Sequence, residues 1–285
     1  MSSQTQPHDL DPAFSSPFGN DAASGVACMA VQPDNKIIAG GYLRIGNTTT
    51  YSSLVRLNED GSFNQDLLPS TTINNVNALL LLPDGKIVIG GIFALDNGNP
   101  DYMLARLNSD GSVDTTFPPV LKSGMTDRLY TLALQSDGKI LAGGSFNAIG
   151  GLATANLARF NTNGTIDPTL NLTEGPNTTG FNDAVSSVVV LPTGKIVVSG
   201  GFTSFSAISA KHIVRLNTDG SLDTTFNTGT GLDGGISSIY VKPDGKMLIG
   251  GSFTTYNGTT LNNFGSLNAD GTIDATFNPG GYRCL

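Results

Sequence analysis

Tryptophan is absent from this chain of 285 residues, and cysteine and histidine occur only twice each. Cys28 and Cys284 are too few for a disulfide scaffold, and they lack the close Cys or His spacing of a zinc site. A Ser-His-Asp triad or a histidine metal site would need His8 and His212, which are far apart in the sequence, to converge. We therefore expect a non-enzymatic protein with no catalytic residues, no metal and no cofactor.

Charged residues are scarce as well, at 13% of the chain, and acidic residues predominate, which gives a formal net charge of -8. Binding to a phosphate backbone requires a basic surface. The sequence also lacks a run of about 18 apolar residues that could span a bilayer. The first residues, MSSQTQPHDLDPAF, contain neither the basic nor the apolar segment of a secretory signal. We expect neither nucleic acid nor a membrane as a partner.

Glycine is abundant, with 36 residues, and a diglycine motif recurs five times. The motif lies at Gly40-Gly41, Gly90-Gly91, Gly143-Gly144, Gly200-Gly201 and Gly250-Gly251. Successive copies are 50, 53, 57 and 50 residues apart. A unit of about fifty residues with short apolar runs cannot bury its apolar faces alone, so the units must stack against one another.

Each copy predicts four short strands joined by tight turns. Apolar runs begin the copies at 26–31, 76–82, 129–134, 185–191 and 236–241. A turn of the PDGK type leads to the strand that ends in the diglycine, and an NxDG turn separates a third strand from a fourth. Because four antiparallel strands per copy describe a propeller blade, we predict an all-β, five-bladed β-propeller. An open β-solenoid is the alternative architecture.

Residues 15–285 are expected to form a single propeller domain, with repeats at about 26–67, 76–117, 129–170, 185–226 and 236–277. The leader before it, residues 1–14, holds a sixth copy of the fourth-strand tail, because LDPAF at 10–14 matches IDATF at 273–277. This copy either completes the last blade, the interpretation that we favour, or docks onto a partner chain. A disulfide between Cys28 and Cys284 could also close the ring; the alternative is one buried and one loose cysteine.

Two long motifs, PDGKIVIGG at 83–91 and LARLNSDGSVDTTF at 104–117, recur in order over about residues 26 to 278. They resemble the delta-60 repeat family, β-propeller units found in tandem in bacterial surface proteins and in some phage proteins. The resemblance implies a propeller in an extracellular or particle-surface setting, and it implies no catalytic residues. The chain departs from the pattern at Ser136 in place of the turn proline, at Thr193 in place of the turn aspartate and at Ser266 in place of a recurring arginine.

The NxDG turns resemble calcium-binding loops of the DxDxDG type, but an arginine stands where the first ligand would be. We therefore interpret them as Asx-type turns. The recurring arginines are expected to be structural and to bind a carboxylate or carbonyl of the same or the next blade. They are Arg56, Arg106, Arg159 and Arg215, and the expected carboxylate partners are Asp114, Asp167, Asp223 and Asp274. Asn64 weakens this pairing in the first repeat.

The turns that join strand one to two and strand three to four are nearly identical between copies, whereas the other connections vary. In a propeller these two sets lie on opposite faces, so the variable face is the expected recognition surface. Its loops span about 43–53, 94–103, 147–156, 203–212 and 254–263, and the links between blades span 15–25, 68–75, 118–128, 171–184 and 227–235. The candidate ligand-binding residues there are Arg44, Tyr51, Asp96, Asp101, Tyr102, Lys122, Asp127, Arg128, His212 and Tyr256. Amides, hydroxyls and tyrosines suit the recognition of a sugar or a protein.

The favoured hypothesis is an adhesion or attachment module, such as a phage virion fibre or decoration protein. Its partner would be a cell-surface glycan, a protein receptor or a neighbouring protein of the virion. The second hypothesis is an exported or surface-bound bacterial propeller that binds a glycan or a protein. The third is a polysaccharide-degrading enzyme, although no acidic cluster stands out beyond the turn aspartates.

Overall fold

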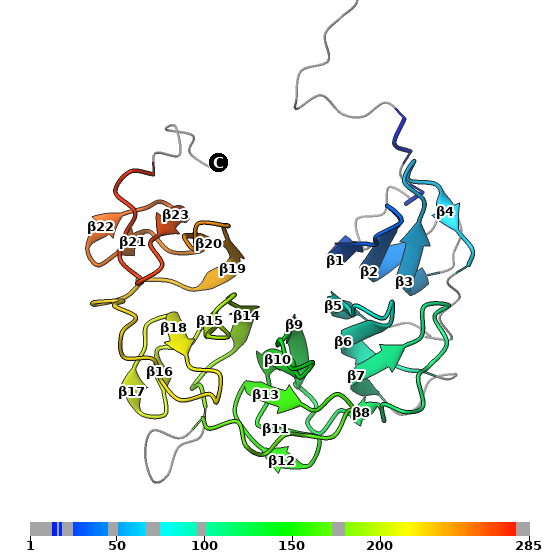
Figure 1. The fold of residues 1–285 in the computed structure, drawn as a ribbon, viewed down its shortest axis with the longest axis horizontal. Coiled ribbons are helices and arrows are strands. Elements are labelled where there is room, and N and C mark those ends of the chain that lie inside the picture. The colour runs from blue at the N-terminus through cyan, green and yellow to red at the C-terminus, as the bar shows by residue number, and fades with distance from the viewer. Residues whose placement is uncertain are drawn as a thin grey trace, which may run out of the picture.

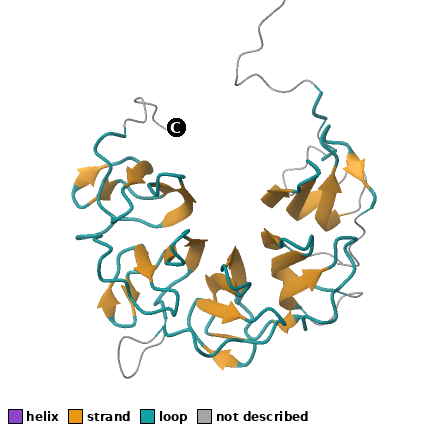
Figure 2. Ribbon diagram, in the orientation of Figure 1, coloured by secondary structure: helices purple, strands orange, loops and turns teal. Residues whose placement is uncertain are grey.

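Antiparallel sheets follow one another around a common centre (Figures 1 and 2). The computed structural model describes residues 13–15, 17–18, 25–44, 51–66, 75–95, 101–172 and 180–277. Within these ranges every regular element is a β-strand. No helix among the described residues is long and apolar enough to cross a membrane. The predicted all-β class is confirmed.

Each repeat contributes one blade, and the blades are numbered 1 to 5 in chain order. Blade 1 comprises β1 (Gly25–Val31), β2 (Ile37–Arg44), β3 (Tyr51–Leu57) and β4 (Phe63–Asn64). Blade 2 comprises β5 (Val76–Leu81), β6 (Ile87–Phe93), β7 (Tyr102–Leu107) and β8 (Val120–Leu121). Blade 3 comprises β9 (Arg128–Leu134), β10 (Ile140–Ser145), β11 (Ala148–Ile149), β12 (Leu152–Ala153) and β13 (Leu157–Phe160). Blade 4 comprises β14 (Val185–Val190), β15 (Ile196–Gly200), β16 (Ser204–Phe205), β17 (Ile208–Ser209) and β18 (Ile213–Leu216). Blade 5 comprises β19 (Ile236–Val241), β20 (Met247–Gly251), β21 (Thr255–Tyr256), β22 (Thr259–Thr260) and β23 (Phe264–Leu267).

The diglycine allows the innermost strand of each blade to bulge against the second strand. In blade 2 the register of β5 against β6 shifts between Val76 and Ala78. A Cβ on Gly91, which lies opposite this bulge, would be 2.1 Å from the carbonyl oxygen of Asn75. The second glycine of the motif is therefore required by the close approach of the bulged backbone.

The first glycine of the motif serves the contact between neighbouring blades. The innermost strands touch in the series β1, β5, β9, β14 and β19. In blades 2, 3 and 4 the first apolar side chain of the innermost strand enters the space that a glycine of the preceding blade leaves open, as Val185 of β14 does at Gly143 of β10. In blade 4 the register places Ser199 at this position, so the motif there is Ser199-Gly200. A Cβ on Gly143 would lie only 2.6 Å from Cγ1 of Val185. The apolar core accordingly runs across the junctions, with Ala133 of blade 3 packed into the cluster of blade 4.

The fourth strand is shorter than the sequence analysis predicts. In blade 1 it forms a strand, β4, which pairs with β3, whereas the fourth strand of the sheet in blade 2 is β8, which comes from the link that follows and pairs with β7. In the other blades the corresponding residue makes a single antiparallel bridge, and these bridges are Leu107↔Val113, Phe160↔Ile166, Leu216↔Leu222 and Leu267↔Ile273. The Asp that follows closes a turn with its own carboxylate, as Asp167 Oδ1 accepts from Thr169 N at 2.9 Å, and this turn ends the strand.

The blades form an open arc, and a gap separates blade 1 from blade 5 (Figure 1). The predicted closure of a five-bladed ring is therefore absent from the structure. Cys28 is a free thiol in the structure, and its Sγ donates to the carbonyl oxygen of Val76 at 3.5 Å. Its proposed partner, Cys284, lies outside the described residues.

The described part of the N-terminal tail, residues 13–15, lies on blade 1. Ser15 N donates to Asp60 O at 2.9 Å, and a Cβ on Gly61 would lie 3.0 Å from the ring of Phe14. The same contacts join Asn227 to Asp270 and Phe226 to Gly271 in blade 5. On blade 1 these residues therefore take the place that the tail of a preceding blade takes elsewhere, and the favoured interpretation, completion of the last blade, stays a prediction. The rest of this copy, residues 10–12, lies outside the described residues.

Candidate functional site

The turn between the first and second strands and the turn between the third and fourth strands recur in every blade. They lie side by side on one face of the molecule, which we call the constant face. A Cβ on Gly138, in the first turn of blade 3, would lie 3.0 Å from the methyl group of Thr162 in the second turn. Within the second turn, Asn163 Oδ1 accepts from Thr165 N at 3.1 Å and from Thr165 Oγ1 at 2.7 Å. The acceptor groups of this turn are thus directed at its own backbone and hydroxyl, as an Asx-type turn requires.

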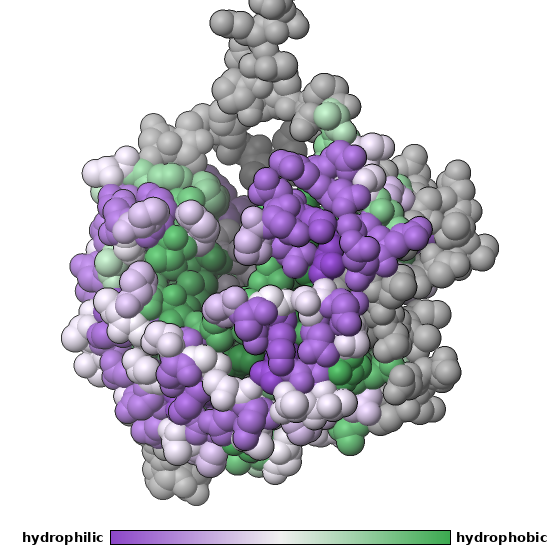
Figure 3. Space-filling model, turned by 45° about the vertical axis from the view of Figure 1, so that its right-hand side comes forward, coloured by the Kyte–Doolittle hydropathy of each residue, from purple (hydrophilic) through white to green (hydrophobic). Residues whose placement is uncertain are grey.

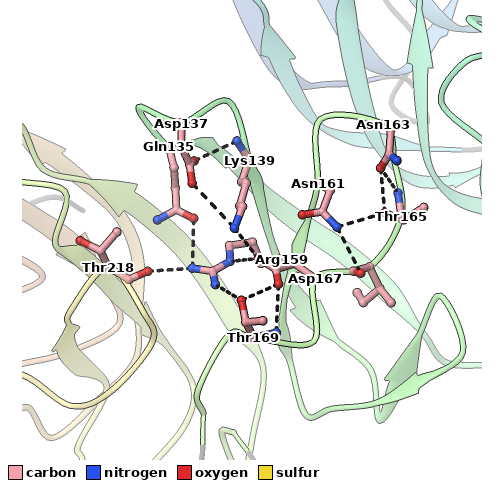
Figure 4. A network of polar contacts seen from close by, with 11 residues as sticks. Gln135, Asp137, Lys139, Arg159, Asn161, Asn163, Thr165, Asp167, Thr169 and Thr218 are labelled. Carbon is pink, nitrogen blue, oxygen red and sulfur yellow. Dashed lines mark hydrogen bonds and ion pairs between the residues drawn. The ribbon is translucent and has the colours of Figure 1, made fainter.

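A network of charged side chains lies beneath these turns (Figure 4). In blade 3, Asp167 Oδ2 accepts from Arg159 Nε at 2.8 Å and forms an ion pair with Lys139 Nζ at 2.9 Å. Thr169 closes the network, with Oγ1 donating to Asp167 Oδ1 at 2.6 Å. Blades 2 and 4 repeat this arrangement with Arg106 and Asp114 and with Arg215 and Asp223. Asp274 of blade 5 binds Lys246 and Ser266 instead.

The same arginines also bind the next blade. Arg159 NH1 donates to the carbonyl oxygen of Thr218, in the second turn of blade 4, at 2.7 Å. Equivalent bonds join Arg56 to Ser109 O, Arg106 to Thr162 O and Arg215 to Ala269 O. Arg106 and Arg215 additionally lie over the rings of Phe117 and Phe226, with the guanidinium carbon 4.7 and 4.8 Å from the ring centroids. All four arginines therefore hold a turn of the next blade, and Arg106, Arg159 and Arg215 also hold a carboxylate of their own blade.

The electrostatics of the network favour ionised aspartates. Burial alone would raise the pKa of the Asp167 carboxyl, but hydrogen bonds from Thr169 and Lys139 and the charge of Arg159 together hold this pKa well below its ordinary value. The pKa values of Asp114 and Asp223 are lowered by the same balance of burial against lysine, threonine and arginine donors. These carboxylates are committed to the blade and are not available as general acids at neutral pH.

The first and last repeats depart from this pattern. In blade 1, Asn64 replaces the aspartate, and its Nδ2 donates to Asn58 Oδ1 at 2.7 Å. Arg56, which is buried, consequently has no partner at Nε. In blade 5, Ser266 replaces the arginine, and its hydroxyl donates to Asp274 Oδ2 at 3.2 Å. Blade 5, which lacks the arginine, is also the blade that has no neighbour on this side among the described residues (Figure 1).

The connections between strands two and three form a second surface, the variable face. In blades 3, 4 and 5 they are β-hairpins, β11–β12, β16–β17 and β21–β22. Their two-residue turns, Gly150-Gly151, Ser206-Ala207 and Asn257-Gly258, have positive φ at both positions. That conformation defines the turn that best fits the twist of a hairpin. The predicted loops at 147–156, 203–212 and 254–263 are therefore ordered projections from the blades.

The links between blades are bound to these hairpins. In blade 5, Asp233 Oδ1 accepts from Thr254 N and Thr255 N, both at 2.8 Å, and Oδ2 accepts from the Thr254 hydroxyl. In blade 4, Asn182 Oδ1 accepts from Thr203 N at 2.9 Å and Ser204 N at 2.8 Å. The hydrogen bonds from Thr254, led by that of its hydroxyl, lower the pKa of Asp233. Link and hairpin thus form one continuous polar surface on each of these blades.

Several predicted ligand-binding residues have structural roles. Tyr256 is fully buried, and its hydroxyl donates to Gly271 O at 2.6 Å. Burial raises the pKa of this phenol above its ordinary value. His212 has φ of 72° and places Nδ1 3.1 Å from Gly200 O, in the corner that Asn156 and Asn263 form in the neighbouring blades. Asp127 is buried, and its Oδ2 accepts from Gly124 N at 2.5 Å. These three residues support the loops from within.

The remaining predicted residues are spread over the molecule. Arg128 is exposed at the start of β9, whereas Arg44, Asp101, Tyr102 and Lys122 are half-buried. Tyr51 begins β3, and Asp96 lies outside the described residues. The pairing of β7 with β8 brings three of them together, because Lys122 N donates to Asp101 O at 3.1 Å and Tyr102 pairs with Leu121.

The exposed side chains of the variable face belong to residues that the sequence analysis did not single out. They include Ser209, Thr259 and Thr260 on the hairpins and Asn262 at the end of the loop in blade 5. Ile208 adds an exposed apolar side chain beside Ser209. The turn signal that could have located them, Asn257-Gly258 between short runs of threonine and tyrosine, is present in the sequence.

A cavity of about 470 Å³ lies at the edge of blades 2 and 3. Pro119, Val120 and Leu121 line it on one side, and the hairpin turn at Gly150 lines it on another. None of the residues that line it carries a charge, so it offers no general acid or base. Across the described ranges, no three His, Cys, Asp or Glu side chains lie close enough together to hold a metal ion.

Five segments match a single family model, described as a domain of unknown function (DUF5122) beta-propeller. The matched residues are 32–65, 82–117, 135–170, 191–226 and 242–277. The chain belongs to this family. Its five matches coincide with the five blades and confirm the predicted tandem propeller repeat, while the delta-60 name stays a prediction. No functionally curated protein matches the sequence.

Solved structures share the fold at low sequence identity. Virginiamycin B lyase from Staphylococcus aureus is 15% identical with a TM-score of 0.53, and the match covers 90% of this chain and 71% of the lyase. A gluconolactonase from Xanthomonas campestris is 16% identical with a TM-score of 0.47, over 79% of this chain and 68% of that one. PorZ, a surface component of the type-IX secretion system of Porphyromonas gingivalis, is 12% identical with a TM-score of 0.45, over 87% of this chain and 33% of PorZ. At these identities the likeness to the lyase shows a propeller fold and nothing about activity.

Proposed function

We propose that this DUF5122 propeller is a non-enzymatic binding module that attaches to a partner through its variable face. The partner is a cell-surface glycan or a protein, and the setting is a surface assembly, such as the fibre or decoration of a phage virion. One observation carries the proposal: the hairpins β16–β17 and β21–β22 expose the hydroxyl groups of Ser209, Thr259 and Thr260, and none of these is engaged in a contact between blades among the described residues.

The division of labour between the two faces supports this proposal. On the constant face the charged groups of blades 2, 3 and 4 are engaged in the network of arginine, lysine and aspartate. On the variable face, Thr259 and Thr260 are exposed hydroxyl residues on the rigid hairpin of blade 5. Hydroxyl and amide groups on a rigid frame suit hydrogen bonding to the hydroxyl groups of a sugar or to a polar protein surface.

The state of the carboxylates supports binding rather than catalysis. Asp233, the acidic residue held among the hairpin residues of blade 5, accepts hydrogen bonds with both oxygens. The carboxylates beneath the constant face are paired with arginine and lysine. Hydrolysis of a glycoside requires two carboxyl groups facing one substrate, one of them free to protonate the leaving group.

The experiment is a binding assay of the purified chain on a glycan array and on intact bacterial cells. Two double variants alter exposed side chains of the variable face. Thr259→Ala with Thr260→Ala removes two hydroxyl groups, and Ile208→Ser with Ser209→Ala exchanges an apolar side chain and a hydroxyl group. Two matched controls, Ser109→Ala and Ala269→Ser, change exposed side chains of constant-face turns whose carbonyl oxygens receive the arginines.

We expect binding to weaken in the variable-face variants and to stay unchanged in the controls, with equal thermal stability in all four. Equal binding by wild type and both variable-face variants would contradict the proposal. Incubation with capsule or lipopolysaccharide tests the enzymatic alternative, since shortening of the polysaccharide chains would show a hydrolase.

A further inference from the structure

The two ends of the arc expose matching halves of the contact that joins neighbouring blades. We infer that the face of blade 1 and the face of blade 5 bind each other head to tail between two copies of this chain. The inference concerns the ends of the arc and does not depend on what the variable face binds.

Blade 1 exposes the half that elsewhere enters the preceding blade. Val26 is 42% exposed, whereas the same position in the other blades, Val76, Leu129, Val185 and Ile236, is at most 1% exposed. Met29 and Val31, further along β1, are 68% and 66% exposed. Met29 corresponds to Val188 in blade 4. Val188 is buried against blade 3, and a Cβ on Gly143 of that blade would lie 3.1 Å from the Val188 side chain. The apolar side chains of β1 thus lack only a blade to receive them.

Blade 5 exposes the complementary half. Phe264 on β23 is 38% exposed, whereas the same position in blades 1 to 4 is at most 1% exposed, at Leu54, Leu104, Leu157 and Ile213. Tyr240 on β19 is 62% exposed, whereas Ala133 at its position in blade 3 is buried in the cluster of blade 4. A Cβ on Gly250 would meet nothing closer than 3.9 Å, so the seat that Gly143 offers to Val185 is open here. Figure 3 shows hydrophobic side chains gathered on the inward-facing surface where Figure 1 places β14 and β19.

Continuity with the four existing junctions identifies the occupant. The surface that fits β1 is the trailing side of a blade of this type, and the surface that fits Tyr240 and Gly250 is the leading side of one. A second copy of the chain carries both. Exposed apolar patches of this kind mark protein interfaces. A contact between unlike surfaces of two identical chains is of the head-to-tail class.

Contact between two copies is favoured over closure of one copy on itself. The four junctions are fixed by the same arginine bonds and apolar contacts, and with that curvature blades 1 and 5 do not meet (Figure 1). In either arrangement the position at Gly61 that the tail of a preceding blade occupies at other junctions is taken by Phe14. Phe277, the tail of blade 5, instead packs on Phe264 with ring centroids 5.6 Å apart. Without the arginine and the tail, this junction rests on apolar contacts alone, so we expect reversible association.

The experiment measures molar mass by sedimentation over a range of concentrations. Wild type is compared with Met29→Asp, which spoils the face of blade 1, and with Tyr240→Asp, which spoils the face of blade 5. Both side chains are exposed, so the variants should keep the thermal stability of wild type. We expect wild type to associate as its concentration rises and each variant to remain monomeric.

Mixing the two variants distinguishes head-to-tail contact from the alternatives. The Met29→Asp chain retains an intact blade 5, and the Tyr240→Asp chain retains an intact blade 1. Their equimolar mixture should therefore form a dimer that grows no further. A wild type that stays monomeric at its highest soluble concentration, as a self-closing ring would, overturns the inference. Variants that associate alone, or a mixture that stays monomeric while wild type associates, would overturn it as well.

Discussion

Asn64 offers a direct test of the buried charge network, because the chain carries the same site with and without its carboxylate. In blade 3 the Asp167 carboxylate receives Arg159 Nε and Lys139 Nζ, whereas in blade 1 the corresponding Arg56 Nε has no partner. Asn64→Asp should supply that partner at almost unchanged volume. The matched control, Asp167→Asn, should recreate in blade 3 the arrangement that blade 1 has now.

The expected magnitudes follow from the burial of these groups. A hydrogen bond to a charged group contributes about 1.5 to 3 kcal/mol to stability, and burying a new carboxylate costs part of this gain. We expect Asn64→Asp to raise the free energy of unfolding by about 1 kcal/mol. Removing one partner of a buried ion pair costs about 3 to 5 kcal/mol. Because the Lys139 side chain is 29% exposed and can turn to water, we expect Asp167→Asn to cost nearer 3 kcal/mol.

The assay is urea unfolding at pH 7, followed by circular dichroism and compared through the midpoint and slope of each transition. The Asn64→Asp midpoint should rise and the Asp167→Asn midpoint should fall, with unchanged slopes. A lowered midpoint for Asn64→Asp would refute the reasoning, because it would mean that the charge of Arg56 is already compensated in the folded chain.

Three further predictions concern the junctions, the carboxylates and the thiol. Gly143→Ala should lower the free energy of unfolding by about 1 to 3 kcal/mol, because the new Cβ would lie 2.6 Å from Val185. Gly250→Ala should lower it by less than about 0.5 kcal/mol. Equal losses in thermal unfolding would contradict the open end of blade 5. The folded-state pKa values of Asp114, Asp167 and Asp223 are lowered, so these groups stabilise the folded chain above the pKa of an unfolded aspartate, about 4, and this contribution is lost as the pH falls below that value. Urea midpoints should therefore stay level from about pH 7 to 5 and then drop. Midpoints that rise on acidification would argue against the network. Burial raises the pKa of Cys28 to about 12. In a Cys284→Ser background this half-buried thiol should therefore react with a disulfide reagent more slowly in the folded chain than in the unfolded chain, and equal rates would contradict the raised pKa.

The sequence was sufficient to predict the blade and its charged network. The spacing of the diglycines predicts five units, and the apolar runs before and after each turn correspond to the first three strands of every blade. The recurrence of Arg159 and its counterparts in the third strand, with aspartate in the tail, predicts a bond to a carboxylate or carbonyl of the same or the next blade. The aspartate partners could be named because arginine and aspartate repeat at the same offset, whereas the turn carbonyls of the next blade could not be named from the sequence.

The variable face was less predictable, because its structure depends on single turns that do not repeat in sequence. Ser206-Ala207 forms the same positive-φ turn as Gly150-Gly151, and no glycine marks it. From the sequence, Tyr256 is predicted to be a surface residue because it lies in a loop. Phe205 and Ile149, at its position in the neighbouring hairpins, are buried as well, and this shared apolar position indicates a core contact.

Closure of the ring depends on the angle between blades, which no local pattern encodes. The side chains that pack against Gly143 and its counterparts set the angle of each junction, and small differences in their packing accumulate around the arc. The N-terminal copy of the tail indicated that one blade binds an additional tail. The sequence alone left open which blade this is, and the contact of Phe14 with Gly61 shows that it is blade 1.

The most direct test of the central claim, that the constant face builds the propeller and the variable face recognises a partner, is to measure stability and cell binding on the same two variants. Arg159→Gln, on the constant face, should lower the free energy of unfolding by about 2 to 4 kcal/mol while leaving the affinity of the folded chain unchanged. Thr259→Ala with Thr260→Ala should leave stability unchanged and weaken binding. Loss of affinity in folded Arg159→Gln, or full affinity in the threonine variant, would contradict the account.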